Sequence, residues 1–414
     1  MSRRSRALSL TVAVLLGAAA CQRRGAPPGS SVPPADRPSV ATGRVADEFT
    51  VPSPSDSSAA WQRAEAVARR LKLPDGFSIA PYAVGFKKPR ALAFASDGTP
   101  LVADLETGAI VALPDRDGDG RADANVKILE RLDFPNSIAV DGATLLIAVK
   151  DGIYRSTYDP AVRSAGKPEK IVPLPVRAGI RHQTRTVAVG PDGRLYIAVS
   201  STCDACEEPD ERYAALLVAD RDGGNVRVYA QGLRNTVYFT FDRAGRIWGN
   251  DMGQDDLGPT LPPDELNVIQ NGRHYGWPYC YGNNQLGTFS SNPTVCQGKT
   301  PPAYAYPAHV APLGIRFINS PQFPAAWQGD AISALHGSWN IEPPAGYKVV
   351  RLKIDGVRVL GMEDFITGWL EHVPGQNSAL TSPGRPAYLA FDPDGRLFVV
   401  DDSAGAVFRV SARP

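Results

Sequence analysis

Residues 187–197 read VAVGPDGRLYI, in which two short apolar runs flank the segment Gly-Pro-Asp-Gly. Alternating apolar residues predict strands that bury one face, and Asp-Gly between two such runs predicts a hairpin turn. Gly193 suits that turn because glycine adopts a positive φ without steric cost. The stretch therefore predicts two antiparallel strands joined by a tight turn.

The same pattern returns at 92–102, 138–147, 238–248 and 388–399. The turn glycines are Gly98, Gly142, Gly193, Gly245 and Gly395. Successive gaps between them are 44, 51, 52 and 150 residues, and a period near 50 with several strands per repeat is typical of a β-propeller. Because residues 76–414 have room for about six such blades, we predict an all-β, six-bladed β-propeller with sites at one mouth of its channel. A linear array of β-sandwiches is the alternative.

Residues 253–312 interrupt this pattern, because they lack clear alternation and contain two cysteines. We expect an elaborated blade whose long loops lie over one face. Long loops inside a compact domain are often functional.

The composition excludes two classes of function. Lys and Arg number 44 and Asp and Glu 43, which gives a net charge of +1 over 414 residues. This balance argues against nucleic-acid binding through phosphate neutralisation and against a polybasic membrane-surface protein. Hydrophobic residues make up 43% of the chain, enough for a real core. Gly (39) and Pro (37) are abundant, as expected for many short strands and turns.

The first residues are typical of an export signal. Arginines precede an apolar run at 7–20, which is too short to span a bilayer and ends in Ala-Ala-Ala before Cys21. We interpret residues 1–21 as a lipoprotein-type signal peptide with Cys21 as the lipidated residue. The protein would then be exported and anchored by lipid, facing the periplasm or the cell surface. The alternative is an ordinary exported protein.

The segment after the signal is rich in Pro, Ser, Ala and Gly and poor in apolar residues. We therefore expect a disordered tether at 22–57 and the propeller at 58–414. A short helix is expected at 59–71, because its apolar residues recur on one face.

Four cysteines remain once Cys21 is set apart. An even number in an exported protein predicts two disulfides, and the local pairs Cys203–Cys206 and Cys280–Cys296 are favoured among three possible connectivities. A redox-active or zinc-binding Cys-x-x-Cys at 203–206 is the alternative.

An acidic loop at 115–123 places aspartates at alternating positions with glycines between them. Such a loop can wrap a hard cation with oxygen ligands. We predict a structural Ca²⁺ site made by Asp115, Asp117, Asp119 and Asp123, with a solvated acidic turn as the alternative.

Several polar residues stand directly before repeat strands. His182 lies between Arg181 and Arg185 at a strand entrance, where a neutral imidazole could act as a general base. Arg234 and Asn235 precede the next repeat strand and offer a planar donor fork and an amide. Cations in separate blades could converge on an anionic ligand, although each alone could also be a surface charge.

Further segments complete a set whose order carries a resemblance. The set comprises His182, Leu-Arg-Asn at 233–235, PDELN at 263–267, YGWP at 275–278 and Gly-Arg-Pro at 384–386. In this order they resemble the soluble quinoprotein glucose/sorbosone dehydrogenases, nearer to the sorbosone-dehydrogenase-like branch. The resemblance covers about residues 74–412. It implies a six-bladed propeller that binds pyrroloquinoline quinone (PQQ) and Ca²⁺ and oxidises a sugar hydroxyl or a hydrated aldehyde.

The resemblance also implies roles for the residues that match. His182 would be the general base for the substrate hydroxyl, with hydride passing to the quinone. Arg234 would stabilise the developing oxyanion. Asn235 would hydrogen-bond the cofactor, and Lys348 and Arg385 would pair with its carboxylates.

The same resemblance implies the metal ligands and the partners. The backbone carbonyls of Gly253 and Gln254 would ligate Ca²⁺, and Asp264 would hold a coordinated water. A sugar or sugar aldehyde would be the substrate. Because the sequence contains no cytochrome domain after the propeller, a separate cytochrome or quinone would accept the electrons.

Departures from the family pattern restrict these expectations. Arg181 stands where glucose-oxidising members have an acidic residue, and Ala387 stands where they have a second arginine. We therefore expect altered cofactor anchoring and a substrate other than glucose. Asn136 is a further candidate substrate contact.

The alternatives to a dehydrogenase are a non-catalytic surface-tethered binding propeller and a Ca²⁺-dependent lactonase-type hydrolase. The hydrolase would need carboxylates to dominate the channel.

Overall fold

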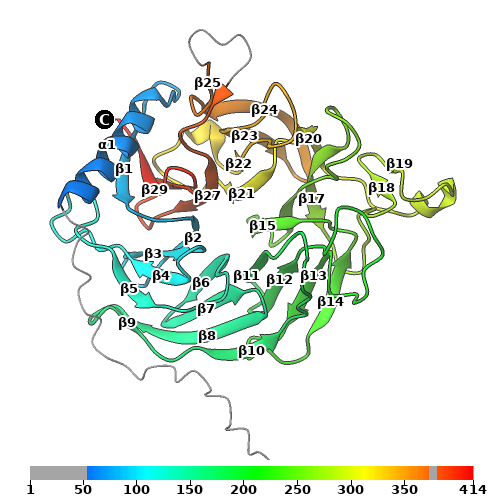
Figure 1. The fold of residues 1–414 in the computed structure, drawn as a ribbon, viewed down its shortest axis with the longest axis horizontal. Coiled ribbons are helices and arrows are strands. Elements are labelled where there is room, and N and C mark those ends of the chain that lie inside the picture. The colour runs from blue at the N-terminus through cyan, green and yellow to red at the C-terminus, as the bar shows by residue number, and fades with distance from the viewer. Residues whose placement is uncertain (1–53, 373–379, 414) are drawn as a thin grey trace, which may run out of the picture. The chain divides into compact units, whose positions relative to one another are not determined.

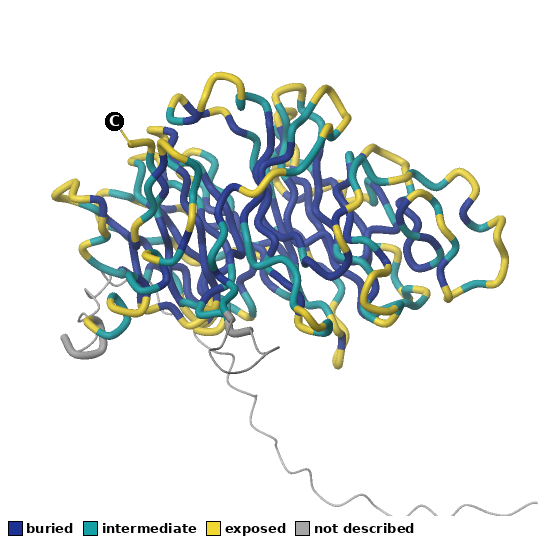
Figure 2. The backbone as a smooth tube through the Cα atoms, turned by 90° about the horizontal axis from the view of Figure 1, so that it is seen from above, coloured by how far each residue is buried: buried dark blue, intermediate teal, exposed yellow. Residues whose placement is uncertain are grey.

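The computed structural model describes residues 54–372 and 380–413. Within them, six antiparallel sheets are arranged around a common centre (Figure 1). The first strand of each sheet packs against the first strand of the next, and β27 packs against β2, which closes the ring. The predicted six-bladed β-propeller is confirmed. Figure 2 shows the buried residues in the interior of the molecule and the exposed residues at its periphery.

The first three blades follow one another in chain order. Blade 1 consists of β2 (Pro89–Phe94), β3 (Pro100–Asp104), β4 (Ala109–Ala112) and β5 (Val126–Leu129). Blade 2 consists of β6 (Ser137–Asp141), β7 (Thr144–Val149), β8 (Gly152–Asp159) and β10 (Glu169–Pro173), with β9 (Ser164–Ala165) paired to β8. Blade 3 consists of β11 (Arg185–Val189), β12 (Leu195–Val199), β13 (Ala215–Ala219) and β14 (Arg227–Gln231).

The last three blades include an insertion and the closure of the ring. Blade 4 consists of β15 (Thr236–Phe241), β16 (Ile247–Asp251), β17 (Pro263–Ile269) and β20 (Tyr304–Ala308). Blade 5 consists of β21 (Pro312–Phe317), β22 (Ala331–Leu335), β23 (Lys348–Asp355) and β24 (Arg358–Ile366), and β25 (Glu371–His372) and β26 (Leu380–Thr381) form a small hairpin after it. Blade 6 consists of β27 (Pro386–Phe391), β28 (Leu397–Asp401), β29 (Ala406–Ala412) and the N-terminal strand β1 (Phe77–Val84).

The closure of the ring joins residues far apart in sequence. Strand β1 pairs with β29 in antiparallel register, from Phe77 opposite Ala412 to Val84 opposite Ala406. Because one sheet contains both ends of the propeller sequence, the ring cannot open without breaking this ladder.

All five predicted hairpins are present, and their turn glycines have φ between 62° and 84°. The sequence pattern did not predict the hairpin of blade 5, because a longer connection replaces the Asp-Gly turn there. This connection is residues 318–330, and it includes the short helix η2 (Ala325–Trp327). This connection and the insertion in blade 4 account for the long gap between the last two turn glycines.

The insertion lies at the outer edge of blade 4, where Figure 1 shows β18 (Cys280–Tyr281) and β19 (Gln285–Leu286) beyond β17. The short helix η1 (Pro293–Cys296) completes it, and the predicted disulfide Cys280–Cys296 is formed. This part of residues 253–312 therefore extends the rim of the propeller and does not cover a face.

Helix α1 (Pro54–Arg70) begins earlier than predicted, so residues 54–57 are helical and do not belong to a tether. Proline is tolerated in the first helical turn. The predicted apolar face is confirmed, since Ala64, Val67 and Leu71 are buried in a cluster with residues of blades 5 and 6.

The predicted signal peptide (1–21), the lipidation site Cys21 and residues 22–53 of the predicted tether lie outside the described residues. Among the helices that are described, none has the length and apolar character needed to cross a bilayer.

Candidate active site

A cavity of about 340 Å³ lies where the inner strands of the blades begin. Its lining comes from residues just before or at the start of the first strand of several blades and from residues just after the second strand. The Asp-Gly turns join the opposite ends of the same strands, so the cavity and the turns lie on opposite faces. Of the predicted residues, six line this cavity: His182, Arg234, Asn235, Gly253, Asp264 and Arg385.

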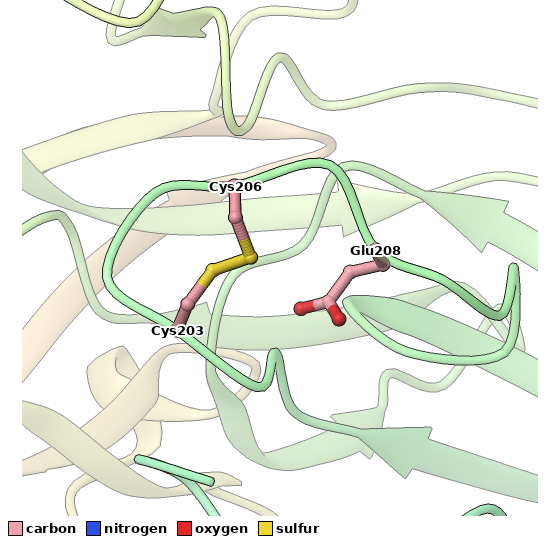
Figure 3. A group of neighbouring side chains, drawn as sticks. All are labelled: Cys203, Cys206 and Glu208. Carbon is pink, nitrogen blue, oxygen red and sulfur yellow. A yellow bond between two sulfur atoms is a disulfide. The ribbon is translucent and has the colours of Figure 1, made fainter.

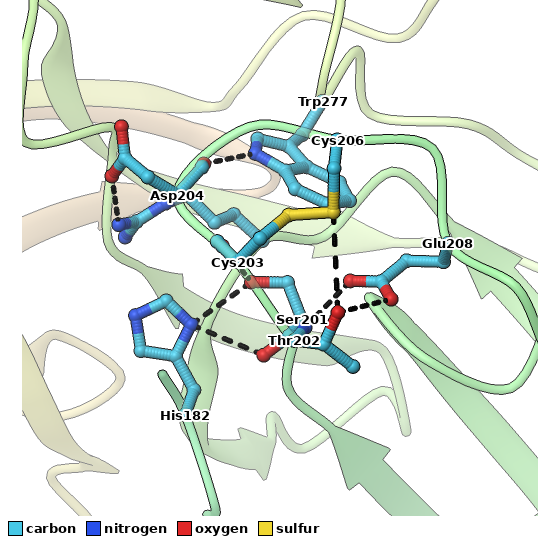
Figure 4. Close-up of a disulfide and its surroundings, with 9 residues drawn as sticks. His182, Ser201, Thr202, Cys203, Asp204, Cys206, Glu208 and Trp277 are labelled. Carbon is cyan, nitrogen blue, oxygen red and sulfur yellow. Dashed lines mark hydrogen bonds and ion pairs between the residues drawn. A yellow bond between two sulfur atoms is a disulfide. The ribbon is translucent and has the colours of Figure 1, made fainter. Parts of the chain in front are cut away.

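His182 lies in the segment that leads into β11, and its hydrogen bonds define its tautomer. Its Nδ1 is 2.9 Å from Ser201 Oγ and 3.2 Å from Ser201 O. Since the Ser201 hydroxyl donates to the carbonyl of Cys203 at 2.9 Å, Ser201 Oγ must accept from His182, and the proton lies on Nδ1. Nε2 therefore carries the lone pair, and Figure 4 shows it directed away from Ser201.

The electrostatic environment keeps this imidazole neutral. Burial, followed by the positive charge of Arg234, lowers the pKa of His182 to about 3. A neutral imidazole with a free Nε2 at a cavity wall is chemically able to accept a proton from a hydroxyl.

Arg234, directly before β15, is only 3% exposed and is held by two carboxylates. Its Nη2 lies 2.6 Å from Asp204 Oδ1 and 2.9 Å from Asp255 Oδ2, its Nε donates to Asp204 O at 3.0 Å, and its Nη1 donates to Met252 O at 3.2 Å. The guanidinium is therefore fixed at the cavity wall that also contains His182.

The loop between these two residues contains the predicted disulfide Cys203–Cys206, which is formed in the structure (Figure 3). The carboxylate of Glu208 lies near the two sulfurs. Because both sulfurs are bonded to each other, the alternative of a zinc-binding Cys-x-x-Cys finds no support here.

Asn235 is positioned by a buried carboxylate at the end of β16. Asp251 Oδ1 accepts from the backbone N–H of Asn235 at 2.7 Å, and Oδ2 accepts from that of Arg234 at 3.0 Å. The side-chain oxygen of Asn235 accepts from Ser200 Oγ at 2.7 Å. Asn235 itself lines the cavity.

In two other blades, an aspartate at the end of the second strand accepts a backbone hydrogen bond in the same way. Asp401 at the end of β28 accepts from the backbone N–H of Arg385 at 2.7 Å, and Asp104 at the end of β3 accepts from that of Lys88 at 2.8 Å. Asp104, Asp251 and Asp401 each follow their turn glycine by the same number of residues. This constant spacing is a sequence signal for the aspartates that position the cavity wall, and the motifs did not indicate it.

Arg385 lies on the wall opposite His182 and has no carboxylate partner among the described residues. Its Nε donates to His336 O at 3.0 Å, its Nη2 donates to Gly337 O, and its guanidinium carbon lies 5.0 Å from the centre of the Tyr347 ring. The charge is therefore oriented and free to pair with an anionic ligand.

Lys348 does not reach the cavity. It begins β23, and its ammonium pairs with Asp364 of β24 at 2.6 Å. This placement does not support the predicted pairing of Lys348 with a cofactor carboxylate, which stays a prediction.

Asp402 and its two partners, which the motifs did not indicate, lie at the same wall. Asp402 accepts from Arg90 Nη1 at 2.7 Å and lies 2.8 Å from His336 Nε2, and both Arg90 and His336 line the cavity. Burial alone would raise the pKa of Asp402, but His336 and Arg90 lower it below its usual value.

The predicted Ca²⁺ ligands are brought together only in part. Gly253 and Asp264 line the cavity, and the two oxygens of Asp264 accept from the backbone N–H groups of Gly253 and Ala311, each at 2.8 Å. Burial raises the pKa of Asp264 to about 6. Gln254 does not line this cavity but lines a small adjoining hollow, which shares Gly253 with the cavity.

The acidic loop brings three of its four predicted ligands together. Carboxylate oxygens of Asp115, Asp117 and Asp119 lie within 4.8 Å of one another. Asp123 instead accepts from the backbone N–H of Arg116 at 2.7 Å, so its carboxylate closes the loop. The structural Ca²⁺ site stays a prediction.

Asn136 is fully buried and lies outside the cavity lining. Its amide nitrogen donates to Arg185 O at 3.1 Å and to Thr186 Oγ1 at 3.2 Å. Asn136 therefore joins blades 2 and 3, and the expected substrate contact is corrected.

Residues 71–413 match the family model described as TrAA12-like. The chain belongs to the TrAA12-like family. The resemblance drawn from the motifs is thereby confirmed at the level of soluble PQQ-dependent sugar dehydrogenases, and the closer affinity to a sorbosone branch stays a prediction.

Two curated relatives and one solved structure extend the TrAA12-like match. The PQQ-dependent pyranose dehydrogenase of Coprinopsis cinerea is 24% identical over 413 residues, which cover 82% of this chain but 54% of that protein. The PQQ-dependent sugar dehydrogenase of Hypocrea jecorina is 24% identical over 397 residues, with coverage of 81% and 87%. The holo PQQ domain of the Coprinopsis cinerea pyranose dehydrogenase superposes with a TM-score of 0.70 at 23% identity, over 82% of this chain and 97% of that one, which shows a shared fold.

Proposed function

We propose that this protein is a PQQ- and Ca²⁺-dependent dehydrogenase that oxidises a sugar or a sugar aldehyde. The convergence of His182, Arg234 and Arg385 in one cavity carries the proposal. They come from the entrances to three different blades, and isolated surface charges would have no reason to meet there.

The chemistry of the cavity lining fits an anionic planar cofactor. Arg385 is oriented without a carboxylate partner, Arg90 and His336 lie beside it, and Asn235 faces the cavity. These groups would hold cofactor carboxylates in place of Lys348. The cavity volume of about 340 Å³ lies within the ~300–1,000 Å³ typical of small-molecule sites.

The protein's own residues would perform the acid–base and electrostatic parts of the reaction. When bound, PQQ and Ca²⁺ would supply a hydride-accepting quinone and a cation that polarises it. His182 Nε2 would take the proton of the sugar hydroxyl as general base. Arg234 would stabilise negative charge that develops near it, and its fixed guanidinium needs no reorganisation to do so. The backbone carbonyl of Gly253, with Asp264 beside it, would contribute oxygen to a Ca²⁺ site.

The lining argues against the hydrolase alternative. Asp255 and Asp264 are the acidic residues of the lining, whereas four arginines belong to it: Arg90, Arg181, Arg234 and Arg385. A Ca²⁺-only hydrolase would need carboxylates to dominate, and a cationic lining favours an anionic ligand.

The location and partners form part of the same proposal. A lipid on Cys21 would tether the protein at the periplasmic or outer surface, where sugars and PQQ are accessible. A separate cytochrome or quinone would then accept the electrons.

The decisive experiment is reconstitution of the purified protein with PQQ and Ca²⁺, followed by dye reduction across a panel of aldoses and sorbosone. H182A serves as the paired variant, and a thermal shift on PQQ addition reports cofactor binding independently. Activity that requires PQQ and collapses in H182A would support the proposal. If PQQ neither binds nor supports activity, the protein is a binding propeller, and the dehydrogenase proposal is overturned.

A further inference from the structure

One short loop contacts the proposed catalytic residue Arg234 directly and reaches His182 through Ser201. The loop is Cys203–Cys206, closed by its disulfide, and Figure 4 shows it beside Ser201, which contacts His182. Its first two residues supply the acceptors on which the orientations of these side chains depend.

The first chain of hydrogen bonds runs from Cys203 through Ser201 to His182. The carbonyl of Cys203 accepts the hydroxyl proton of Ser201, and this forces Ser201 Oγ to accept from His182 Nδ1. If Cys203 O moved away, the Ser201 hydroxyl could rotate and donate to His182, and only the Ser201 carbonyl, at 3.2 Å, would still favour the proton on Nδ1.

The second set of hydrogen bonds joins Asp204 directly to Arg234. The carbonyl of Asp204 accepts from Arg234 Nε at 3.0 Å and from Trp277 Nε1 at 2.9 Å. Its carboxylate accepts from Arg234 Nη2 at 2.6 Å and from the backbone N–H of Asp255 at 2.9 Å. Both the carbonyl and the carboxylate of one loop residue thus hold the guanidinium.

The two disulfides of the described residues differ in exposure. Cys280 and Cys296 are 6% and 7% exposed, whereas Cys203 and Cys206 are half-buried. Because thiol–disulfide exchange requires access to a sulfur, a reductant should reach Cys203–Cys206 first.

We propose that the disulfide loop Cys203–Cys206 is a positioning element for His182 and Arg234, and that its reduction by a dithiol converts the enzyme to a state of low turnover. The exchange is balanced: the dithiol loses two electrons and two protons to become a cyclic disulfide, and the protein S–S bond becomes two thiols. This inference rests on the proposed dehydrogenase function for its activity readout.

The test compares the wild type with C203S/C206S and with the matched control C280S/C296S. Each is loaded with PQQ and Ca²⁺ and assayed before and after dithiothreitol, with thiols counted by mass spectrometry. We expect kcat of C203S/C206S to be about tenfold or more below that of the wild type, with KM little changed, because misplaced groups slow the chemical step more than substrate binding. Dithiothreitol should lower wild-type kcat to the same level, reoxidation should restore it, and C203S/C206S should not respond. C280S/C296S should keep the wild-type response.

A readout without cofactor separates this inference from the proposed function. In the PQQ-free protein, reduction should shift the fluorescence of Trp277, whose indole nitrogen donates to Asp204 O, and W277F should lose that shift. If no variant reduces dye but the shift appears, the proposed function fails and the loop coupling stands. If complete reduction of Cys203–Cys206 changes neither kcat nor the fluorescence, the inference is overturned.

Discussion

Asp402 Oδ1 lies 2.8 Å from His336 Nε2, and this contact joins blades 5 and 6 at the wall of the cavity. The other oxygen of Asp402 pairs with Arg90 of blade 1 at 2.7 Å, and both partners are largely buried. One carboxylate therefore links three blades where the ring closes.

We predict that D402N is strongly destabilising. Asparagine would leave the buried guanidinium of Arg90 without a counter-charge, and breaking such a pair costs about 3–5 kcal/mol. Urea unfolding should show this as a lower free energy of unfolding. D364N, which removes the exposed partner of Lys348, is the control and should change stability by less than about 1 kcal/mol. Equal effects of the two substitutions would contradict the role assigned to Asp402.

The contrast between Arg385 and Lys348 leads to a prediction about cofactor affinity. R385Q should weaken PQQ binding by about ten- to a hundredfold, because a hydrogen bond to a charged group contributes about 1.5–3 kcal/mol. K348M should leave the affinity within about twofold, since Lys348 pairs with Asp364 away from the cavity. Calorimetric titration of the apoprotein with PQQ measures both. A large loss in K348M would show that the lysine leaves Asp364 when cofactor binds.

The depressed pKa of His182 predicts an unusual acid limb in the pH dependence. Burial and the charges of Arg234 and Arg181 favour neutral imidazole and outweigh Asp204, and together they lower the pKa of His182 to about 3. The base should thus remain available well below pH ~6.5, where an unperturbed histidine becomes protonated. The pH profile of kcat/KM should show no loss near 6.5 from this residue, and H182N should lose about 10²–10⁴-fold at every pH.

The same shift has a consequence for stability. Since the folded pKa lies below the unfolded one, the unfolded chain binds the proton more readily between pH ~6.5 and ~3. His182 therefore opposes folding increasingly as the pH falls through that window, and it has no such effect above it. H182N should lose less stability than the wild type on acidification from pH 7 to pH 4. A steeper acid loss in H182N would contradict the assignment of a neutral buried imidazole.

Asp204 allows the charge of the disulfide loop to be tested apart from its covalent closure. D204N keeps the backbone carbonyl that accepts from Trp277 and Arg234 but removes the ion pair with Arg234. We expect kcat to fall about tenfold with the melting temperature nearly unchanged. D210N, which removes a partly buried ion pair with Arg212, is the matched control and should leave kcat unaltered.

Sequence pattern accounts for much of the fold because each Asp-Gly turn joins the first two strands of a blade. His182, Arg234 and Arg385 could be singled out because each stands directly before an inner strand, and inner strands converge on the axis. The ion pair of Lys348 with Asp364 could not be anticipated, because a motif does not reveal which way a side chain leaves a strand. The pairing of Arg90 with Asp402 joins residues 312 positions apart, and such contacts depend on closure of the ring.

Trp339 provides the last prediction, on substrate binding. It is 69% exposed although it lines the cavity, and the guanidinium of Arg181 lies 5.9 Å from its ring centre. Arg181 pairs with Asp255, which also pairs with Arg234, so the indole is tied to the wall that contains the proposed catalytic groups. The C–H face of a pyranose can cover such a ring, because the π face carries partial negative charge.

Covering roughly 40 Å² of that indole would contribute about 1 kcal/mol to the free energy of substrate binding, at ~25 cal/mol per Å². We therefore expect KM to be about fivefold higher in W339A. The PQQ affinity of W339A should not change. The KM of W339F should stay close to the wild-type value. F289A removes an exposed aromatic outside the cavity and should leave KM as it is. An unchanged KM in W339A for every sugar that the wild type oxidises would exclude a contact between the indole and the substrate. A parallel loss of PQQ affinity would instead assign Trp339 to cofactor binding.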